Sequence, residues 1–417
     1  MTTATSTATR SASRRRARAS SATGGALLAR GAIVLAVLTL AAGVTVKGVA
    51  THLARTEARA AAALAPYDAR AAIAAAEVGS AAGARVATPE VRRLTRLALM
   101  RDLTLPTAIE FRALQAEADH DPAREARLFE LSSAISRRSL PTRLWLIQRS
   151  VDGGDVAGAL ENFDIALRTS MSAPDVLFPV LANAASDPGL DGPIARILDR
   201  PEDWRLAFLH HAITEAHAGP GIAAVVLQMR DRRLILGDHV DQSLVGELVS
   251  ERQFVLARMV HDAFSPAAGA AFVADPQFAD ARMQHPFGWD LIQTGTSGAS
   301  RTRIGGQPAL EYQTSPGGGG QAATQLLTLA PGVWRLTVTT AAPANDPVSQ
   351  PFWTLTCAGE GGAQLGLVDQ PGAPGASAAT DFTVPDGCTG QWLALTVRAS
   401  DEPNLTGSIR SVQISRR

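Results

Sequence analysis

Hydrophobic and polar residues follow two different periods along this chain of 417 residues, and the change falls near residue 270. Before that point, Ala-, Leu- and Arg-rich stretches place apolar side chains about every three to four residues, the spacing of helices that bury one face. After it, short runs with alternating apolar positions are separated by Gly- and Pro-rich turns, which is typical of strands. The order predicts an all-helical domain followed by an all-β domain.

Two stretches of the helical part match each other. Pro106-Thr107 and Asp121-Pro122 open one predicted pair of helices, and Pro141-Thr142 and Gly154-Asp155 open a second pair at offsets of 35 and 33 residues. Further helical segments separated by Pro, Gly or Asp continue the series over 174–185, 192–198, 201–217, 221–232, 240–249 and 251–264. The spacing predicts an array of helical hairpins, with a compact helical bundle as the alternative.

The second helices of the two pairs carry a further signal. Phe129 and Phe163 lie 34 residues apart in corresponding helices, and Ala159 and Ala166 place small residues around the second aromatic. This pattern resembles the tetratricopeptide repeat, in which small residues allow close helix contact and an aromatic fills the gap. The first helices match the Trp, Leu-Gly and Tyr positions of that repeat poorly. The resemblance implies an α-solenoid over residues 51–270 that holds envelope protein partners.

The last part of the chain predicts a sandwich of two antiparallel sheets. Eight short strand candidates run over 288–294, 309–314, 323–329, 332–339, 352–357, 381–384, 391–397 and 408–414. Four segments add a more specific pattern: Pro276-Gln277-Phe278-Ala279-Asp280, Pro286-Phe287-Gly288-Trp289, Leu329 to Leu336, and Gly407-Ser408-Ile409 followed by Val412 and Ile414. Over residues 275–417 this pattern resembles the jelly-roll carbohydrate-binding modules. The resemblance implies contact with polysaccharide, and a structural calcium ion is possible because some jelly rolls bind one.

Trp392 is the candidate for stacking on a sugar ring. Leu393 and Leu395 share one face of its strand, so Trp392 points to the opposite face. Packing under a loop or helix is the alternative. The other tryptophans of this region share parity with apolar neighbours and are expected in the core: Trp289, Trp334 and Trp353. Polar residues that would add contacts to a glycan, if they share the face of Trp392, are Glu311, Gln313 and Arg335.

The chain has two cysteines, Cys357 and Cys388, and both lie near strand ends of the predicted sandwich. Neither lies in the N-terminal tail or in the apolar segment that follows it. The pair therefore favours a disulfide formed in an oxidising compartment. A metal site is not expected, because no pair of histidines lies nearby in the sequence.

The most apolar segment runs from Ala26 to Val46 and would reach about 31 Å as a helix, the thickness of a bilayer core. Five arginines precede it, and no acidic residue occurs before Glu57. The positive-inside rule then predicts a single-pass protein of the bacterial inner membrane. Residues 1–25 would form a disordered cytoplasmic tail, residues 26–50 would cross the lipid bilayer through 26–46, and the bulk would be periplasmic. A cleaved signal peptide is the alternative and would export the same part.

The sequence contains no recognisable catalytic motif. The balance of 39 basic and 39 acidic residues argues against nucleic acid as a partner. The run HHAITEAH lacks the spacing of zinc peptidases and predicts only a helix-surface pair between His211 and Glu215. Gly295-Thr296-Ser297-Gly298 is one residue short of a nucleophile elbow and is expected to be a turn. We therefore expect a protein that is not an enzyme and has no cofactor.

Together these features predict a non-catalytic, membrane-tethered envelope adaptor. Its helical repeats would hold protein partners, and its sandwich would contact polysaccharide. The architecture is similar to that of accessory proteins of bacterial exopolysaccharide synthesis and export, which is an analogy of architecture. The alternatives are a structural assembly protein whose sandwich docks protein, and a glycan-processing enzyme with an unrecognised site.

Overall fold

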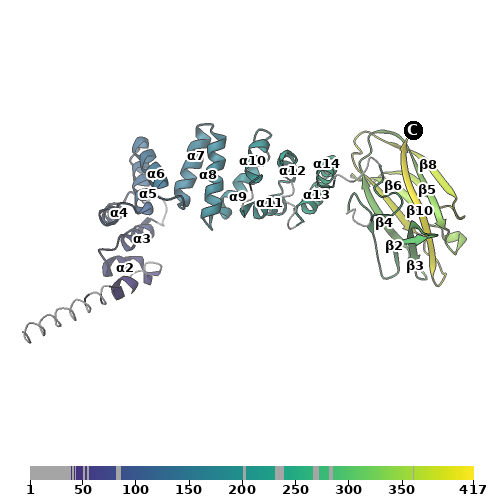
Figure 1. Cartoon of the computed structure of the whole chain (residues 1–417), viewed down its shortest axis with the longest axis horizontal. Helices are drawn as coiled ribbons and strands as arrows, with labels where there is room; N and C mark the ends of the chain where they lie inside the picture. The colour runs from purple at the N-terminus through teal and green to yellow at the C-terminus, as the bar shows by residue number, and fades with distance from the viewer. Residues whose placement is uncertain are drawn as a thin grey trace, which may run out of the picture. The chain divides into compact units, whose positions relative to one another are not determined.

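A computed structural model describes residues 39, 42, 44–49, 52–53, 56–80, 86–200, 203–230, 239–265, 272–280, 285–359 and 361–417. Contacts between residues divide the chain into two compact units, Met1–Ser170 and Met171–Arg417. The described part consists of α-helices followed by two antiparallel sheets (Figure 1), so the predicted order of an α and then a β region is confirmed. The domain boundaries predicted at residues 25, 50, 270 and 275 stay predictions.

The predicted membrane span lies mostly outside the described residues, as does the whole tail 1–25. Within residues 26–46 the structure describes only Thr39, Ala42 and 44–46, all of them helical. Among the described residues, no helix has both the length and the hydropathy that a membrane crossing requires.

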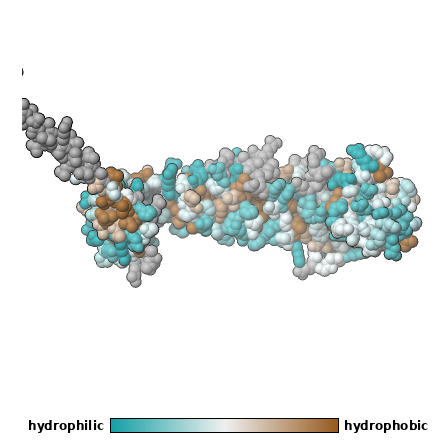
Figure 2. All heavy atoms as spheres, turned by 90° about the horizontal axis from the view of Figure 1, so that it is seen from below, coloured by the Kyte–Doolittle hydropathy of each residue, from teal (hydrophilic) through white to brown (hydrophobic). Residues whose placement is uncertain are grey.

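The first unit is built from helical hairpins. Its helices are α2 (Ala58–Leu64), α3 (Ala69–Ser80), α4 (Pro89–Arg101), α5 (Pro106–Ala118), α6 (Pro122–Ile135), α7 (Leu140–Asp152) and α8 (Val156–Thr169). Sequential pairs pack together, α3 with α4, α5 with α6 and α7 with α8. Apolar residues also gather on part of the surface that the first helices form (Figure 2), and Val78 and Met100 are among the exposed ones.

The hairpins α5–α6 and α7–α8 share their helix starts and their aromatic positions. The carboxylates of Asp121 and Asp155 accept hydrogen bonds from the N–H of the third residue of α6 and of α8, Arg124 and Gly158. Phe129 and Phe163 occupy the same position in the two helices and are both buried. Phe129 also stacks on Trp145 of α7, with ring centroids 4.9 Å apart. This register supports a repeating hairpin, whereas membership of the tetratricopeptide family stays a prediction.

The second unit begins with six more described helices: α9 (Ala173–Ala184), α10 (Asp191–Leu198), α11 (Trp204–Thr214), α12 (Gly219–Gln228), α13 (Val240–Ser250) and α14 (Phe254–Phe264). Here helices pack against the next helix but one along the chain, including α10 with α12 and α11 with α13. The last helix, α14, contacts the sandwich directly. A Cβ added to Gly390, in the turn before β9, would lie 2.5 Å from the Cγ atom of Phe254.

The sandwich consists of two five-stranded sheets with the orders β1-β4-β9-β6-β7, here called sheet A, and β2-β3-β10-β5-β8, called sheet B. The strands are β1 (Asp290–Leu291), β2 (Ser297–Ile304), β3 (Gln307–Thr314), β4 (Gly320–Leu327), β5 (Gly332–Ala342), β6 (Phe352–Cys357), β7 (Gln364–Asp369), β8 (Ser377–Val384), β9 (Gln391–Val397) and β10 (Leu405–Arg416). The chain repeatedly crosses between the sheets, as in jelly rolls.

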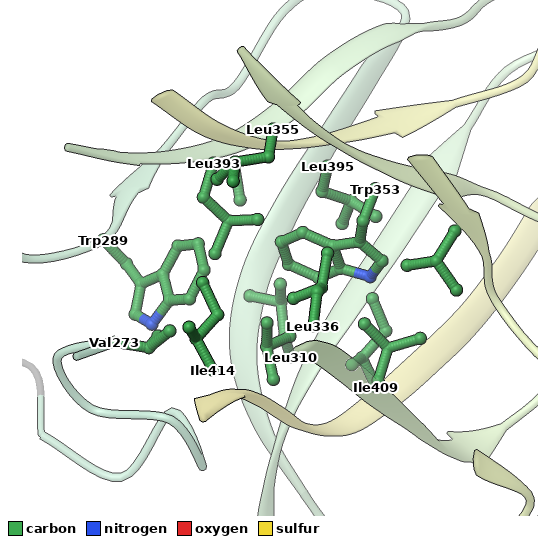
Figure 3. Close-up of a cluster of buried hydrophobic side chains, with 14 of the residues drawn as sticks. Val273, Trp289, Leu310, Leu336, Trp353, Leu355, Leu393, Leu395, Ile409 and Ile414 are labelled. Carbon is green, nitrogen blue, oxygen red and sulfur yellow. The ribbon is translucent and has the colours of Figure 1, made fainter. Parts of the chain in front are cut away.

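The core of the sandwich lies between the two sheets (Figure 3). The side chains of Trp334 and Trp353 are 1% and 0% exposed, and Trp289 is 4% exposed. The prediction that these three tryptophans form the core is therefore confirmed.

Two edge strands were not predicted from the sequence, because neither shows a clean apolar alternation. Strand β2 reads SGASRTRI and lies at one edge of sheet B, where polar side chains can face water. The expected turn at Gly295–Gly298 is therefore wrong in its second half, since β2 already begins at Ser297. Strand β7 lies at an edge of sheet A, beside β8 at the other edge of sheet B.

Candidate functional site

Trp392 lies on β9, the central strand of sheet A. The neighbouring side chains of Leu393 and Leu395 are 0% exposed and belong to the core. Because side chains alternate along a strand, the indole of Trp392 lies on the outer face of sheet A. The residue as a whole is half-buried, and its paired residue on β4, Leu326, is 0% exposed.

Cross-strand partners define the outer face of sheet A around this indole. Trp392 pairs with Thr356 of β6, and Ala394 pairs with Thr354 on the same strand. Next along the two strands, Phe352 of β6 pairs with Thr396 of β9. Directly paired residues share a face of a sheet. We call Trp392, Thr356, Thr354 and Phe352 the sheet A strip.

The strip is about 13 Å long, because Trp392 and Thr396 are four residues apart on one strand. Its threonines are half-buried and present hydroxyl groups that both donate and accept hydrogen bonds. At its far end, the guanidinium of Arg398 lies 4.7 Å from the centroid of the Phe352 ring. Arg398 also pairs with Asp369 at 2.6 Å. The strip is thus a shallow surface with an aromatic ring at each end and hydroxyl groups between them.

His285 extends the strip at the Trp392 end. Its imidazole is nearly parallel to the indole, with centroids 6.1 Å apart and an interplanar angle of 12°. Nδ1 of His285 lies 3.9 Å from a carboxylate oxygen of Asp290, which pairs with Thr324 of β4. The segment is tied to the sheet because the N–H of Leu326 donates a 2.7 Å hydrogen bond to the carbonyl of Pro286.

The three polar candidates from the sequence do not join Trp392. Glu311 and Gln313 lie on β3, and Arg335 lies on β5, so all three belong to sheet B. They alternate with core residues and therefore face outward on the opposite side of the sandwich. Arg335 is further engaged by the carboxylate of Asp381 at 2.7 and 2.9 Å. The condition that these residues share the face of Trp392 is therefore not met, because parity fixes a face but not the sheet to which a strand belongs.

A disulfide fixes the start of β9. Cys357 and Cys388 are bonded, with Cα atoms 5.7 Å apart, as the sequence predicted. Cys357 pairs with Gln391, the residue before Trp392. The buried Gln391 amide donates to the carbonyl of Cys388 at 2.6 Å and accepts from the N–H of Leu329 at 2.8 Å. These bonds hold the backbone that presents the indole.

The buried carboxyl group of Asp275, in the segment before the first strand, is held by hydrogen bonds and by an arginine. Asp275 accepts a 2.6 Å hydrogen bond from the N–H of Ala279, and Arg301 approaches to 3.4 Å. Burial raises the pKa of Asp275. The backbone N–H groups of Ala279 and Asp280, together with Arg301, act in the opposite direction and lower it. The carbonyl of the same residue accepts from the indole N–H of Trp289 at 3.0 Å. Asp275 therefore links the segment before β1 to the core residue Trp289.

The histidine-rich run at 210–217 forms a pair on a helix surface. His211 and Glu215 form the predicted helix-surface pair, with 2.9 Å between Nδ1 and the carboxylate. Within the part of the chain that the structure describes, no three His, Cys, Asp or Glu side chains come together around a point that could hold a metal ion such as calcium.

Neither a protein-family model nor a curated protein sequence matches the chain. Among solved structures, TmCBM61 in complex with beta-1,4-galactotriose is similar at 13% identity and a TM-score of 0.27, over 36% of this chain and 100% of that one. The CBM22-1 xylan-binding domain from Paenibacillus barcinonensis Xyn10C is similar at 12% identity and a TM-score of 0.24, over 33% and 90% of the two chains.

A third similar structure is the enzymatically active domain of bacteriophage CBA120 tailspike protein 4, at 16% identity and a TM-score of 0.25, over 35% of this chain and 21% of that chain. Scores and identities this low do not decide what this chain binds or whether it catalyses a reaction.

Part of the strip could have been found from the sequence. Phe352, Thr354 and Thr356 alternate with Trp353 and Leu355, which were expected in the core, so their outward direction follows from the same parity. His285 carries no such signal, because it precedes the first strand and meets Trp392 only through the tertiary fold.

Proposed function

We propose that this chain is a non-catalytic, membrane-tethered envelope adaptor whose β-sandwich binds polysaccharide along the sheet A strip. The observation that carries the proposal is the half-buried Trp392 on the outer face of a sheet, stacked with His285. A flat indole offers its face to the apolar face of a pyranose ring, and large aromatic surfaces dominate such contacts. The threonine hydroxyls beside it are groups that a sugar hydroxyl can pair with.

The rest of the proposal rests on the sequence and on the disulfide. The arginine-rich tail and the apolar segment 26–46 support a single-pass inner-membrane protein with its bulk in the periplasm. The Cys357–Cys388 bond is consistent with that oxidising compartment. The hairpins of α5–α8 supply the extended surfaces on which we propose that envelope proteins are held, in the manner of systems that make or export exopolysaccharide.

A protein-docking sandwich is the second candidate. Leu367 of β7 is 40% exposed and pairs with Thr354, so it adds an aliphatic group to the strip. Apolar groups of this kind suit a protein partner as well as a sugar face. The two candidate functions differ in the ligand that binds the sheet A strip, which is a polysaccharide in the first and a protein in the second.

Binding to a panel of soluble polysaccharides tests the proposal. The full-length chain in detergent would be compared with Trp392→Ala and with the control Gln313→Ala, an exposed polar residue of sheet B. We expect Trp392→Ala to weaken binding at least tenfold, since loss of one stacked aromatic removes about 1.4 kcal/mol or more. Gln313→Ala should bind like the parent. Equal binding by Trp392→Ala, or no binding by any chain, would contradict the proposal.

A further inference from the structure

His285 borders a groove on the helical side of the sandwich. One cavity of about 170 Å³ is lined by Asp241, Gln242, Val245, His261, Phe264, Ser265 and His285. A second cavity of about 610 Å³ is lined by Gln242, Gly246, Val249, His285 and Pro286. The two share Gln242 of α13 and His285, so they adjoin and form one groove between α13 and the segment before β1.

Contacts between α14 and the segment before β1 hold the two sides of this groove in place. His261 of α14 lies 5.1 Å from the ring of Phe287, and the guanidinium of Arg258 lies 5.4 Å from the same ring. Phe287 is 0% exposed. Because Phe254 also contacts the turn at Gly390, α14 is seated on the sandwich at two points. The groove therefore has a defined shape within the second unit.

The same His285 that borders the groove also stacks on Trp392. A chain-like ligand that lies on the indole therefore meets the imidazole next and then the mouth of the groove. We propose that the polysaccharide site is composite: the ligand runs from the sheet A strip over His285 into the groove, where α13 contacts it through Asp241 and Gln242. This inference rests on the proposed function and extends it from the sandwich to the helical array.

The charges of the groove define the class of polysaccharide. Asp241 lines it and Asp290 lies beside His285, whereas neither set of described lining residues includes a lysine or an arginine. The nearby Arg258 is already held by Asp262 through two contacts of 2.9 Å. The described lining also includes His261 and His285, and these face Asp262 at 3.3 Å and Asp290 at 3.9 Å. With carboxylates on each side of these imidazoles and no lysine or arginine in the described lining, the groove repels a polyuronate and attracts an amine. The site should therefore prefer polysaccharides built from neutral or amino sugars to polyuronates.

Gly246 allows a steric test that leaves the fold intact. It lies inside α13 and lines the larger cavity, and no heavy atom lies within 4 Å of an added Cβ. Replacing a helical glycine favours the helix, so Gly246→Gln should fold while its side chain fills the groove. Gly246→Ala makes the same backbone change with little added volume and is the matched control.

The experiment measures binding of the full-length chain and its variants to a neutral β-glucan, a partly N-acetylated glucosamine polymer and a polyuronate. We expect Gly246→Gln to weaken binding of the neutral polymer at least tenfold and Gly246→Ala to stay within twofold of the parent. We also expect the parent to bind the polyuronate at least tenfold more weakly than the neutral polymer. Asp241→Asn should reduce that preference.

Each contrary outcome points to a different failure. If Trp392→Ala loses binding while Gly246→Gln keeps it, the composite site is overturned and the strip remains. If the polyuronate binds best, the assigned class of polysaccharide is overturned. If neither Trp392→Ala nor Gly246→Gln changes binding, the proposed function itself fails.

Discussion

The disulfide between Cys357 and Cys388 should contribute much of the stability of the sandwich. It closes a loop with a sequence separation of 31 residues. On the chain-entropy account, a loop of this size lowers the free energy of folding by about 3.7 kcal/mol. Alanine removes only the sulfur atom at each position, and Cys388 is 4% exposed. For a sandwich of about 140 residues, the double variant Cys357→Ala/Cys388→Ala should melt roughly 12 °C lower.

Calorimetry of the full-length chain with and without reductant measures this effect. Reductant should lower the melting temperature of the parent sandwich by a similar amount and leave the double variant unchanged. The reasoning is refuted if the double variant melts within about 3 °C of the parent, a shift worth less than about 1 kcal/mol. It is also refuted if two free thiols can be titrated in the unreduced, unfolded parent.

Other predictions concern single positions. Tyr312 is 0% exposed and its hydroxyl has no hydrogen-bond partner among the described residues, so Tyr312→Phe should raise the free energy of unfolding by about 1 kcal/mol at pH 7. Burial raises the pKa of Tyr312 above its usual 10, so the folded state stays protonated while the unfolded state ionises above pH 10. The gain in free energy of unfolding from Tyr312→Phe should therefore grow as pH rises past 10. Urea unfolding at pH 7 and pH 10.5 measures it, and a parent chain that is more stable than the variant at either pH would contradict the prediction. Gly221→Ala should destabilise the chain by about 1–3 kcal/mol, because its Cβ would lie 2.5 Å from the carbonyl oxygen of Ala185. Gly246→Ala should instead stabilise by about 0.5–1 kcal/mol, and thermal melts that give both variants the same sign would refute the contrast.

The sequence predicts most of the elements, because their local signals agree with the fold. Strands β6 and β9 run over the residues that parity indicated, and the start of α6 follows from Asp121 and Pro122. Helix α4 was missed although Thr88, Pro89 and Glu90 form an ordinary helix start, and the Thr88 hydroxyl accepts from the N–H of Val91.

The candidate site was harder to predict, because it depends on which strands become neighbours. Parity correctly separates the outward residues of one strand from its core residues, and this is how Trp392 was found. It does not say that Glu311 lies in sheet B, which depends on long-range strand order, or that His285 reaches the indole, which depends on how the segment before β1 packs. The groove beside α13 likewise needs the packing of α14 on Phe287.

Oxidative footprinting of the full-length chain, with and without a bound polysaccharide, tests the central claim without any substitution. Hydroxyl radicals modify exposed side chains, and mass spectrometry locates the modified residues. Our account predicts that polysaccharide protects Trp392, Phe352 and His285, while Val333 on sheet B, which is 49% exposed, keeps its reactivity. Protection of Val333, or unchanged oxidation of Trp392 at saturating polysaccharide, would contradict it.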